Sequence, residues 1–137
     1  MKVLVSACLL GINCKYNGGN NLDEKVLEFL KDKEVIPVCP EVGLGVPRTP
    51  MEIVGGKLIN KDGVEVDPVV RSAVEEILQK IQEEPVDMAI LKSRSPTCGV
   101  KQIYDGSFSG TLINGSGVLA QALQQMGITT VDADDLK

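Results

Sequence analysis

The chain has 137 residues, enough for one domain, and its core must be aliphatic because 43% of the residues are hydrophobic but only 3% are aromatic. The formal net charge of −5 and the absence of a lysine- and arginine-rich run argue against a protein that grips nucleic acid by its phosphates. No apolar run is long enough to cross a membrane and no signal-peptide pattern is present, so we expect a cytoplasmic protein.

Strand and helix patterns alternate along the chain. Short apolar runs predict four buried strands, at 2–6, 34–38, 88–91 and 128–131. Helical spacing of apolar residues predicts three helices, at 24–31, 68–83 and 118–126. Asp23 and Asp67 are the expected N-caps of the first two helices, and residues 52–66 are expected to form a small extended hairpin region. This order predicts an α/β fold: a single domain over 1–137 with a mostly parallel sheet flanked by helices in a Rossmann-like three-layer arrangement.

Three of the four cysteines follow the ends of different predicted strands. Cys8 comes just after the first strand, Cys39 directly after the second, and Cys98 in the loop after the third. The carboxyl ends of parallel strands lie on one rim of a sheet, where ligands bind. We therefore expect these three thiols to meet in space if their strands are near neighbours.

The sequence alone leaves three explanations of the thiols open. Cysteine is often a small buried hydrophobic residue, although the proline and glycine beside Cys39 and Cys98 place these two in shaped loops. A structural zinc site is opposed by the absence of a C-x₂₋₄-C pair. An iron–sulfur cluster needs thiolates and no histidine, and the chain has no histidine, but the short ferredoxin run is missing as well.

Six local sequences then appear in a recognisable order. They are SACLLG at 6–11, KYNG at 15–18, CPE at 39–41 followed by Pro47-Arg48, LKSRSPTCG at 91–99, IYDGSF at 103–108 and GSGV at 115–118. Together they resemble the thiouracil desulfidase (TudS) family over residues 3–128. The chain departs from the family's usual Arg-Tyr-Asp-Gly and Ser-Pro-Ser-Cys at Lys15, Asn17 and Thr97.

The resemblance implies a 4Fe–4S cluster held by three cysteines, with one iron free of protein ligands. The three family positions correspond to Cys8, Cys39 and Cys98, so Cys14 is interpreted as a spare thiol. The implied reaction replaces C=S by C=O in a thiolated pyrimidine (thiouracil, thiouridine or its nucleotide) without redox change and releases sulfide. An open iron suits a soft thiocarbonyl sulfur.

Candidate catalytic residues follow from this resemblance. A carboxylate is the expected base in a chain without histidine, and Glu41 in the Cys-Pro-Glu motif is the candidate. Ser95 and Ser93 are expected to hold the substrate or the attacking water, and Ser95 is the preferred candidate of the two. Arg48 is a candidate for binding a substrate oxygen or phosphate, with bracing of its own loop as an equal alternative. Tyr16 is a candidate for stacking on a pyrimidine, with packing in its turn as the alternative.

Two further features of the sequence are weaker candidates for binding. Ser107 is a candidate substrate-binding residue, and the amides of residues 115–117 are a candidate anion site at a helix start. Two alternative functions stay open: removal of sulfur from thiouridine in tRNA, which the acidic charge disfavours, and a non-catalytic module that binds a metal or a cluster.

Overall fold

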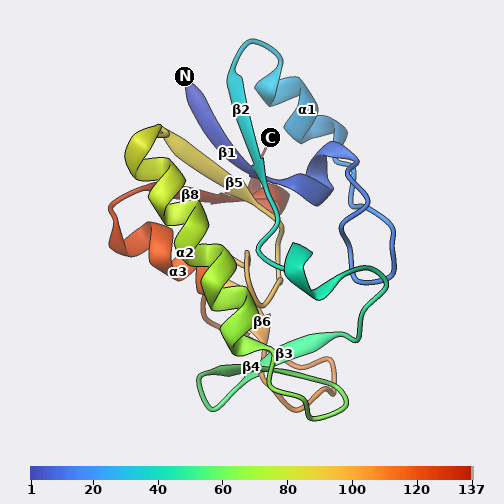
Figure 1. The fold of residues 1–137 in the computed structure, drawn as a ribbon. Coiled ribbons are helices and arrows are strands. Elements are labelled where there is room, and N and C mark those ends of the chain that lie inside the picture. Colours follow the sequence, from blue (N-terminus) through green and yellow to red (C-terminus); the bar gives the residue numbers. More distant parts are fainter. Residues whose placement is uncertain (137) are drawn as a thin grey trace.

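The computed structural model describes residues 1–136, and its centre is a four-stranded parallel sheet (Figure 1). The strands follow the order β2-β1-β5-β8 across the sheet, and all three pairings are parallel. Their bounds are β1 (Lys2–Ser6), β2 (Glu34–Val38), β5 (Met88–Leu91) and β8 (Thr129–Asp132). The predicted parallel sheet is therefore confirmed, with each strand within one residue of its expected place.

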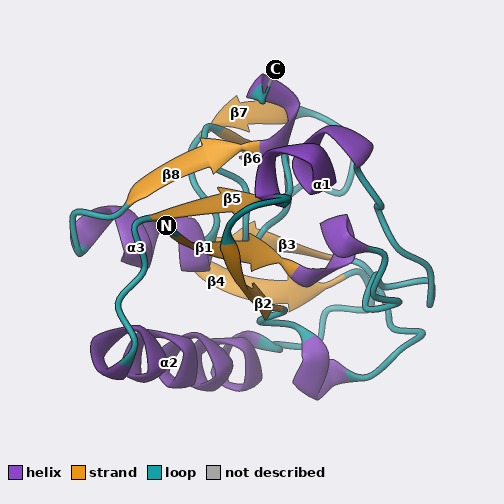
Figure 2. Cartoon of the chain, turned by 90° about the horizontal axis from the view of Figure 1, so that it is seen from above, coloured by secondary structure: helices purple, strands orange, loops and turns teal. Residues whose placement is uncertain are grey.

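Helices cover both faces of this sheet (Figure 2). One face, with Val3 and Val5, packs against α1 (Glu24–Leu30). The other face, with Leu4 and Leu91, packs against α2 (Asp67–Glu83) and α3 (Val118–Gln125). Successive strand residues point to opposite faces, so one short apolar run supplies both cores. The three-layer α/β fold predicted from the sequence is confirmed. No helix among residues 1–136 is both long and apolar enough to span a membrane.

The two predicted helix caps have different outcomes. Asp23 caps α1 as expected, since Oδ1 accepts hydrogen bonds from the amides of Lys25 and Val26. The prediction for Asp67 is wrong: α2 begins at Asp67 itself, and Val66 is the N-cap. The reason is that Oδ1 of Asp67 accepts a 3.0 Å bond from the amide of Leu58, which ties the helix start to a neighbouring strand.

Two small hairpins lie outside the parallel sheet. The first joins β3 (Met51–Val54) to β4 (Lys57–Asn60) and confirms the expected extended region. The second joins β6 (Gln102–Tyr104) to β7 (Leu112–Asn114) and was not expected, because three-residue strands are too short to show an alternating pattern. Glu52 links the two hairpins, since its Oε1 accepts hydrogen bonds from the amides of Gly106 and Phe108.

Three short 3-10 helices complete the elements that the structure describes. They are η1 (Ala7–Leu10), η2 (Val42–Leu44) and η3 (Ala133–Asp135). The first two follow the carboxyl ends of β1 and β2. They turn the chain sharply at the rim of the sheet.

The strand order places a topological switch point between β1 and β5. The chain passes from β1 to β2 on one side, and then crosses to β5 and β8 on the other. At this point Oγ of Ser6 accepts a 3.0 Å hydrogen bond from the amide of Lys92, which joins the two strand ends. Ligands of open α/β sheets bind outside the carboxyl ends of the strands at such a switch point.

Candidate active site

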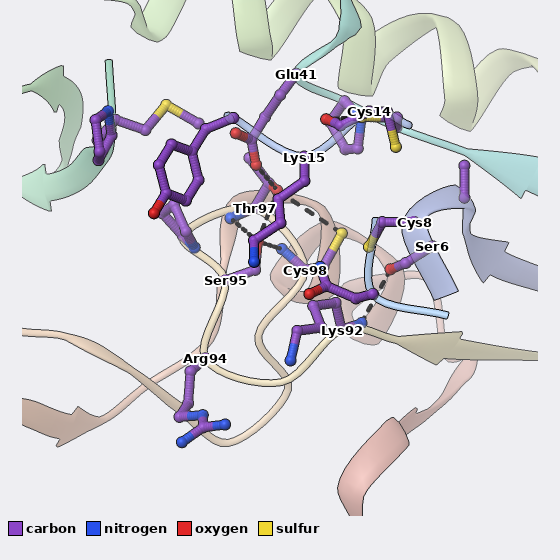
Figure 3. Close-up of a pocket in the computed structure, with 18 of the residues that line it drawn as sticks. Ser6, Cys8, Cys14, Lys15, Glu41, Lys92, Arg94, Ser95, Thr97 and Cys98 are labelled. Carbon is purple, nitrogen blue, oxygen red and sulfur yellow. Dashed lines mark hydrogen bonds between the residues drawn. The ribbon is translucent and has the colours of Figure 1, made fainter. Parts of the chain in front are cut away.

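A cavity of about 480 Å³ opens at this rim, formed mainly by the loops that follow β1, β2 and β5. All four cysteines of the chain line it: Cys8, Cys14, Cys39 and Cys98. Figure 3 shows Cys8, Cys14 and Cys98 around the same space. The strands before Cys8, Cys39 and Cys98 are parallel neighbours, and this adjacency brings together thiols that are far apart in the sequence.

Each thiol is held by a different local structure. Cys8 lies in η1, Cys39 directly follows β2, and Cys98 lies in the loop after β5. Cys98 is 5% exposed and Cys14 is 9% exposed, whereas Cys8 and Cys39 are half-buried. None of the four is paired in a disulfide.

Cys14 shares the cavity, which the interpretation of it as a spare thiol did not anticipate. Its carbonyl oxygen accepts a 2.8 Å hydrogen bond from Nη2 of Arg48 and lies 3.9 Å from Sγ of Cys39. Its place six residues after Cys8, in the loop that leaves the same strand end, was the signal in the sequence. Whether it binds a metal stays open, as does the predicted ligand role of the other three.

Burial strongly affects the ionisation of these thiols. Burial raises the pKa of Cys98 to about 12, although hydrogen bonds with Ser6 and Thr97 act in the opposite direction. Burial, and then the neighbouring Cys39, raise the pKa of Cys14 to about 12, and burial also raises the pKa of Cys8. A thiol binds a metal as a thiolate, so loading a metal centre here must release protons.

The donor set fits an iron–sulfur cluster. The cavity offers thiols and carboxylates but no histidine. Within residues 1–136, no three cysteine, aspartate or glutamate side chains are grouped closely enough to hold a single metal ion. In a 4Fe–4S cluster each thiolate binds a different iron, so the thiols stand farther apart than around one ion.

Glu41 is held on both oxygens of its carboxylate. Oε1 accepts from Nη2 of Arg48 at 3.2 Å, and Oε2 accepts from Oγ1 of Thr97 at 2.8 Å. The side chain of Glu41 is 16% exposed and lines the cavity. Each carboxylate oxygen has two lone pairs, so the carboxylate retains acceptor capacity for a water molecule or a substrate.

The two predicted catalytic serines also line the cavity. Oγ of Ser95 accepts from the amides of Thr97 at 3.2 Å and Cys98 at 3.1 Å. Ser93 is 5% exposed, and its Oγ accepts from Nζ of Lys92 at 3.3 Å. Ser95 is therefore closely integrated into the loop that carries Cys98.

The predicted substrate-binding residues are not all at the cavity. Arg48 and Tyr16 line it, but Ser107 lies on an exposed turn, where it is hydrogen-bonded to Asp105. The guanidinium of Arg48 already binds Glu41 and the carbonyls of Cys14 and Gly45. The structure thus gives Arg48 a bracing role, and substrate binding by Arg48, Tyr16 and Ser107 stays a prediction.

The amides proposed as an anion site are already used within the protein. The amide of Gly117 donates to the carbonyl of Gly99, and the first amides of α3 donate to the carbonyls of Pro96 and Thr97. These bonds fix the loop that carries Cys98 against the start of α3. The expectation of an anion site at residues 115–117 is therefore wrong, because the protein's own carbonyls occupy the helix N-terminus.

Sequence reasoning gave no role to several residues of the cavity, and three of them bear on its chemistry. Lys15 and Lys92 add positive charge to its lining, in a chain that is acidic overall. Thr97 is 1% exposed and binds Glu41. Its position directly before Cys98 was the available signal, but a hydroxyl beside a cysteine has no distinctive spacing.

The fold and the cavity define a class of protein: a three-layer α/β protein whose site, at the switch point of a parallel sheet, is lined by thiols and by the braced carboxylate of Glu41. The family model described as 2-thiouracil desulfurase matches residues 3–135. The chain belongs to this family, and the resemblance found in its motifs is confirmed.

Two relatives extend the comparison. A solved structure of the 4Fe–4S-dependent thiouracil desulfidase TudS has a TM-score of 0.86 and 31% sequence identity, over 98% of this chain and 92% of that one. The uncharacterized protein YbbK of Bacillus subtilis strain 168 is 36% identical, over 98% of this chain and 97% of its own length. Both similarities extend over nearly the whole of each chain.

Proposed function

We propose that this protein is a desulfidase that converts the C=S group of a thiolated pyrimidine to C=O by a non-redox, hydrolytic reaction. The observation that carries the proposal is the shared cavity of Cys8, Cys39, Cys98 and Glu41 at the switch point of the sheet. Membership of the 2-thiouracil desulfurase family supports the reaction class.

Cys8, Cys39 and Cys98 would hold a 4Fe–4S cluster in this cavity, as the similarity to the cluster-dependent TudS structure suggests. When bound, such a cluster with one iron free of protein ligands supplies a Lewis acid for a soft sulfur atom. The remaining chemistry belongs to side chains of this chain.

Glu41 acts as the general base in this proposal. It takes a proton from the water that attacks the thiocarbonyl carbon, and its carboxylate is oriented for this task by Arg48 and Thr97. Ser95, fixed by two backbone amides, lies 3.0 Å from the Thr97 hydroxyl that binds this carboxylate. The carbon keeps its oxidation state: the C–S bond breaks, a C–O bond forms with water oxygen, and sulfur leaves as sulfide.

The substrate is a thiolated pyrimidine as the free base, the nucleoside or the nucleotide. Lys15 and Lys92 line the cavity and offer donors for ring oxygens or for a nucleotide phosphate. Tyr16, at the exposed side of the cavity, offers a ring face to a planar base. The acidic net charge of −5 favours these small molecules over tRNA, because the phosphate backbone of tRNA binds best to a basic surface.

The test is anaerobic reconstitution of the protein with iron and sulfide, followed by a measurement of uracil and sulfide release from thiouracil, thiouridine and thiouridine monophosphate. We expect turnover without an added reductant, and incorporation of one oxygen atom from ¹⁸O-labelled water into the product. A fully loaded protein that is inert on every thiopyrimidine would contradict the proposal. The remaining interpretation would then be a non-catalytic module that binds a cluster.

A matched pair of variants tests the base. Glu41→Gln is expected to keep the cluster absorbance while kcat falls by about 10²- to 10⁴-fold, because an amide cannot take the proton. Glu84→Gln changes an exposed glutamate away from the cavity and serves as the control. Loss of the cluster in Glu41→Gln would assign Glu41 a structural role instead.

A further inference from the structure

Thr97 is buried between the two predicted catalytic side chains. It is 1% exposed, its Oγ1 donates a 2.8 Å hydrogen bond to Oε2 of Glu41, and the same oxygen lies 3.0 Å from Oγ of Ser95 (Figure 3). A buried hydroxyl with two polar partners at these distances is fixed in orientation. Thr97 therefore connects Glu41, in the loop after β2, with Ser95, in the loop after β5.

The direction of these hydrogen bonds follows from counting donors and acceptors. Oγ of Ser95 accepts from the amides of Thr97 and Cys98, which uses both of its lone pairs. The single hydrogen of Thr97 Oγ1 goes to Oε2 of Glu41 at 2.8 Å, because this charged acceptor is closer than Sγ of Cys98 at 3.7 Å. The hydrogen of Ser95 is then left to donate to Thr97, so the bonds run from Ser95 through Thr97 to Glu41.

The backbone around Thr97 is unusually constrained. Its carbonyl accepts from the amides of Leu119 and Ala120 at the start of α3. A Cβ atom on Gly117 would lie 2.5 Å from the carbonyl carbon of Thr97, so the helix start approaches the loop as closely as a glycine permits. These contacts fix the backbone from which the Thr97 hydroxyl projects.

Arg48 holds the other oxygen of the same carboxylate at 3.2 Å. The carboxylate of Glu41 is thus fixed from both ends, by a charge on Oε1 and by a hydroxyl on Oε2. A charged brace alone leaves the carboxylate free to rotate about the bond to its methylene group. The hydroxyl of Thr97 removes this freedom.

We propose that Thr97 is a positioning residue of the desulfidase: its hydroxyl fixes the plane of the Glu41 carboxylate and accepts the hydroxyl hydrogen of Ser95, so that it links the two side chains. This inference deepens the proposed function and depends on it. Thr97 does not act on the substrate itself. It keeps the base and the serine in one arrangement before a substrate enters.

The test compares Thr97→Val, which keeps the shape but removes the hydroxyl, with Thr97→Ser, which keeps the hydroxyl. In reconstituted protein, with kcat expressed per loaded cluster, Thr97→Val is expected to lower kcat by about 10- to 100-fold at an unchanged KM. Thr97→Ser is expected to restore kcat to within about threefold of the wild type. Thr130→Val, in strand β8, removes a threonine hydroxyl away from the cavity and is the control.

A second measurement needs no turnover and separates the inference from the proposed function. The melting temperatures of the reconstituted wild type, Thr97→Val, Glu41→Ala and the double variant form a cycle. We expect Thr97→Val to lower the melting temperature of the wild type but hardly that of Glu41→Ala, because its partner is already gone.

Three results would overturn the inference. They are wild-type kcat in Thr97→Val, additive melting temperatures in the cycle, and loss of the cluster in Thr97→Val but not in Thr97→Ser. The last result would show that the Thr97 hydroxyl acts mainly as a hydrogen-bond donor to Sγ of Cys98, which lies 3.7 Å away. If the wild type itself does not turn over, the proposed function fails, and the cycle still decides whether Thr97 holds Glu41.

Discussion

Arg48 and Glu41 form a nearly buried ion pair beside the four thiols. Nη2 of Arg48 lies 3.2 Å from Oε1 of Glu41, and the two side chains are 8% and 16% exposed. The same guanidinium binds the carbonyl of Cys14 at 2.8 Å and that of Gly45 at 2.9 Å. One side chain thus connects the loop after β1, the loop after β2 and the proposed catalytic base.

We expect Arg48→Met to lower the free energy of unfolding by about 3–5 kcal/mol, because it leaves the Glu41 charge without its partner in a buried place. Arg48→Lys keeps the charge but loses the planar fork, and should recover only part of this loss. Equilibrium unfolding in urea measures both. Arg94→Met, whose side chain is 47% exposed, is the control and should change stability by less than about 1 kcal/mol. An unchanged stability with a raised KM in Arg48→Met would instead favour the predicted role in substrate binding.

The four cysteines are expected to divide into two groups. Cys14→Ala should retain the cluster absorbance and iron content, whereas alanine at Cys8, Cys39 or Cys98 should abolish both, since three thiolates are proposed to hold the cluster. Iron and sulfide analysis after anaerobic reconstitution checks this. If Cys14→Ala also loses iron, Cys14 is a ligand and the proposed open iron is not present.

Gly117→Ala is expected to destabilise the loop that carries Cys98. The backbone at Gly117 has a φ of −67°, which any residue adopts, so the expected destabilisation comes from steric overlap alone. A Cβ atom would lie 2.5 Å from the carbonyl carbon of Thr97 and 2.8 Å from the amide nitrogen of Cys98, and neither can move freely. Overpacking of this kind costs about 1–3 kcal/mol.

Gly115→Ala is a matched control for this change, two residues earlier. There the nearest atom is Cδ1 of Ile103 at 3.2 Å, the end of a side chain that can shift. We expect the control to unfold close to the wild-type temperature and to keep its cluster, while Gly117→Ala melts lower and reconstitutes less iron. Equal behaviour of the two variants would show that the loop adapts.

The raised pKa values of the thiols predict a loss of stability in alkaline solution. In the folded, cluster-free protein Cys14 and Cys98 stay protonated up to about pH 12, whereas in the unfolded chain they ionise from about their ordinary value of 9.0. Above pH 9 the unfolded chain therefore binds fewer protons, and the free energy of unfolding falls as the pH rises. The loss amounts to at most about 1.4 kcal/mol per thiol and pH unit, and it ends near pH 12.

Urea unfolding of the reduced, cluster-free chain between pH 8 and pH 10 measures this slope. Cys14→Ala removes one of the thiols whose pKa is raised, which also include Cys8 and Cys98, and should reduce the slope above pH 9 while leaving stability at pH 8 less affected. A slope that is the same in Cys14→Ala and the wild type would show that Cys14 already ionises in the folded protein.

The sequence by itself determined the elements of the parallel sheet and the place of three thiols at its rim. Strands 2–6 and 34–38 each contain a short apolar run, at 3–5 and 35–38, and a cysteine just after a strand end needs no tertiary information to be noticed. The motifs in the same loops indicated the family, which the comparison confirmed. The cap of α2 and the second hairpin escaped prediction because Asp67 binds an amide of another element and because three-residue strands carry no pattern.

Only the tertiary structure decided what surrounds the thiols. The place of Cys14 in the cavity, the engagement of Arg48 with Glu41, and the bond from Thr97 to Glu41 across fifty-six residues all depend on loops packed against one another. Local propensity acts along the chain and so predicts strands and helices. Contacts between loops depend on the fold as a whole, because the parallel strand order first brings their strand ends to one rim.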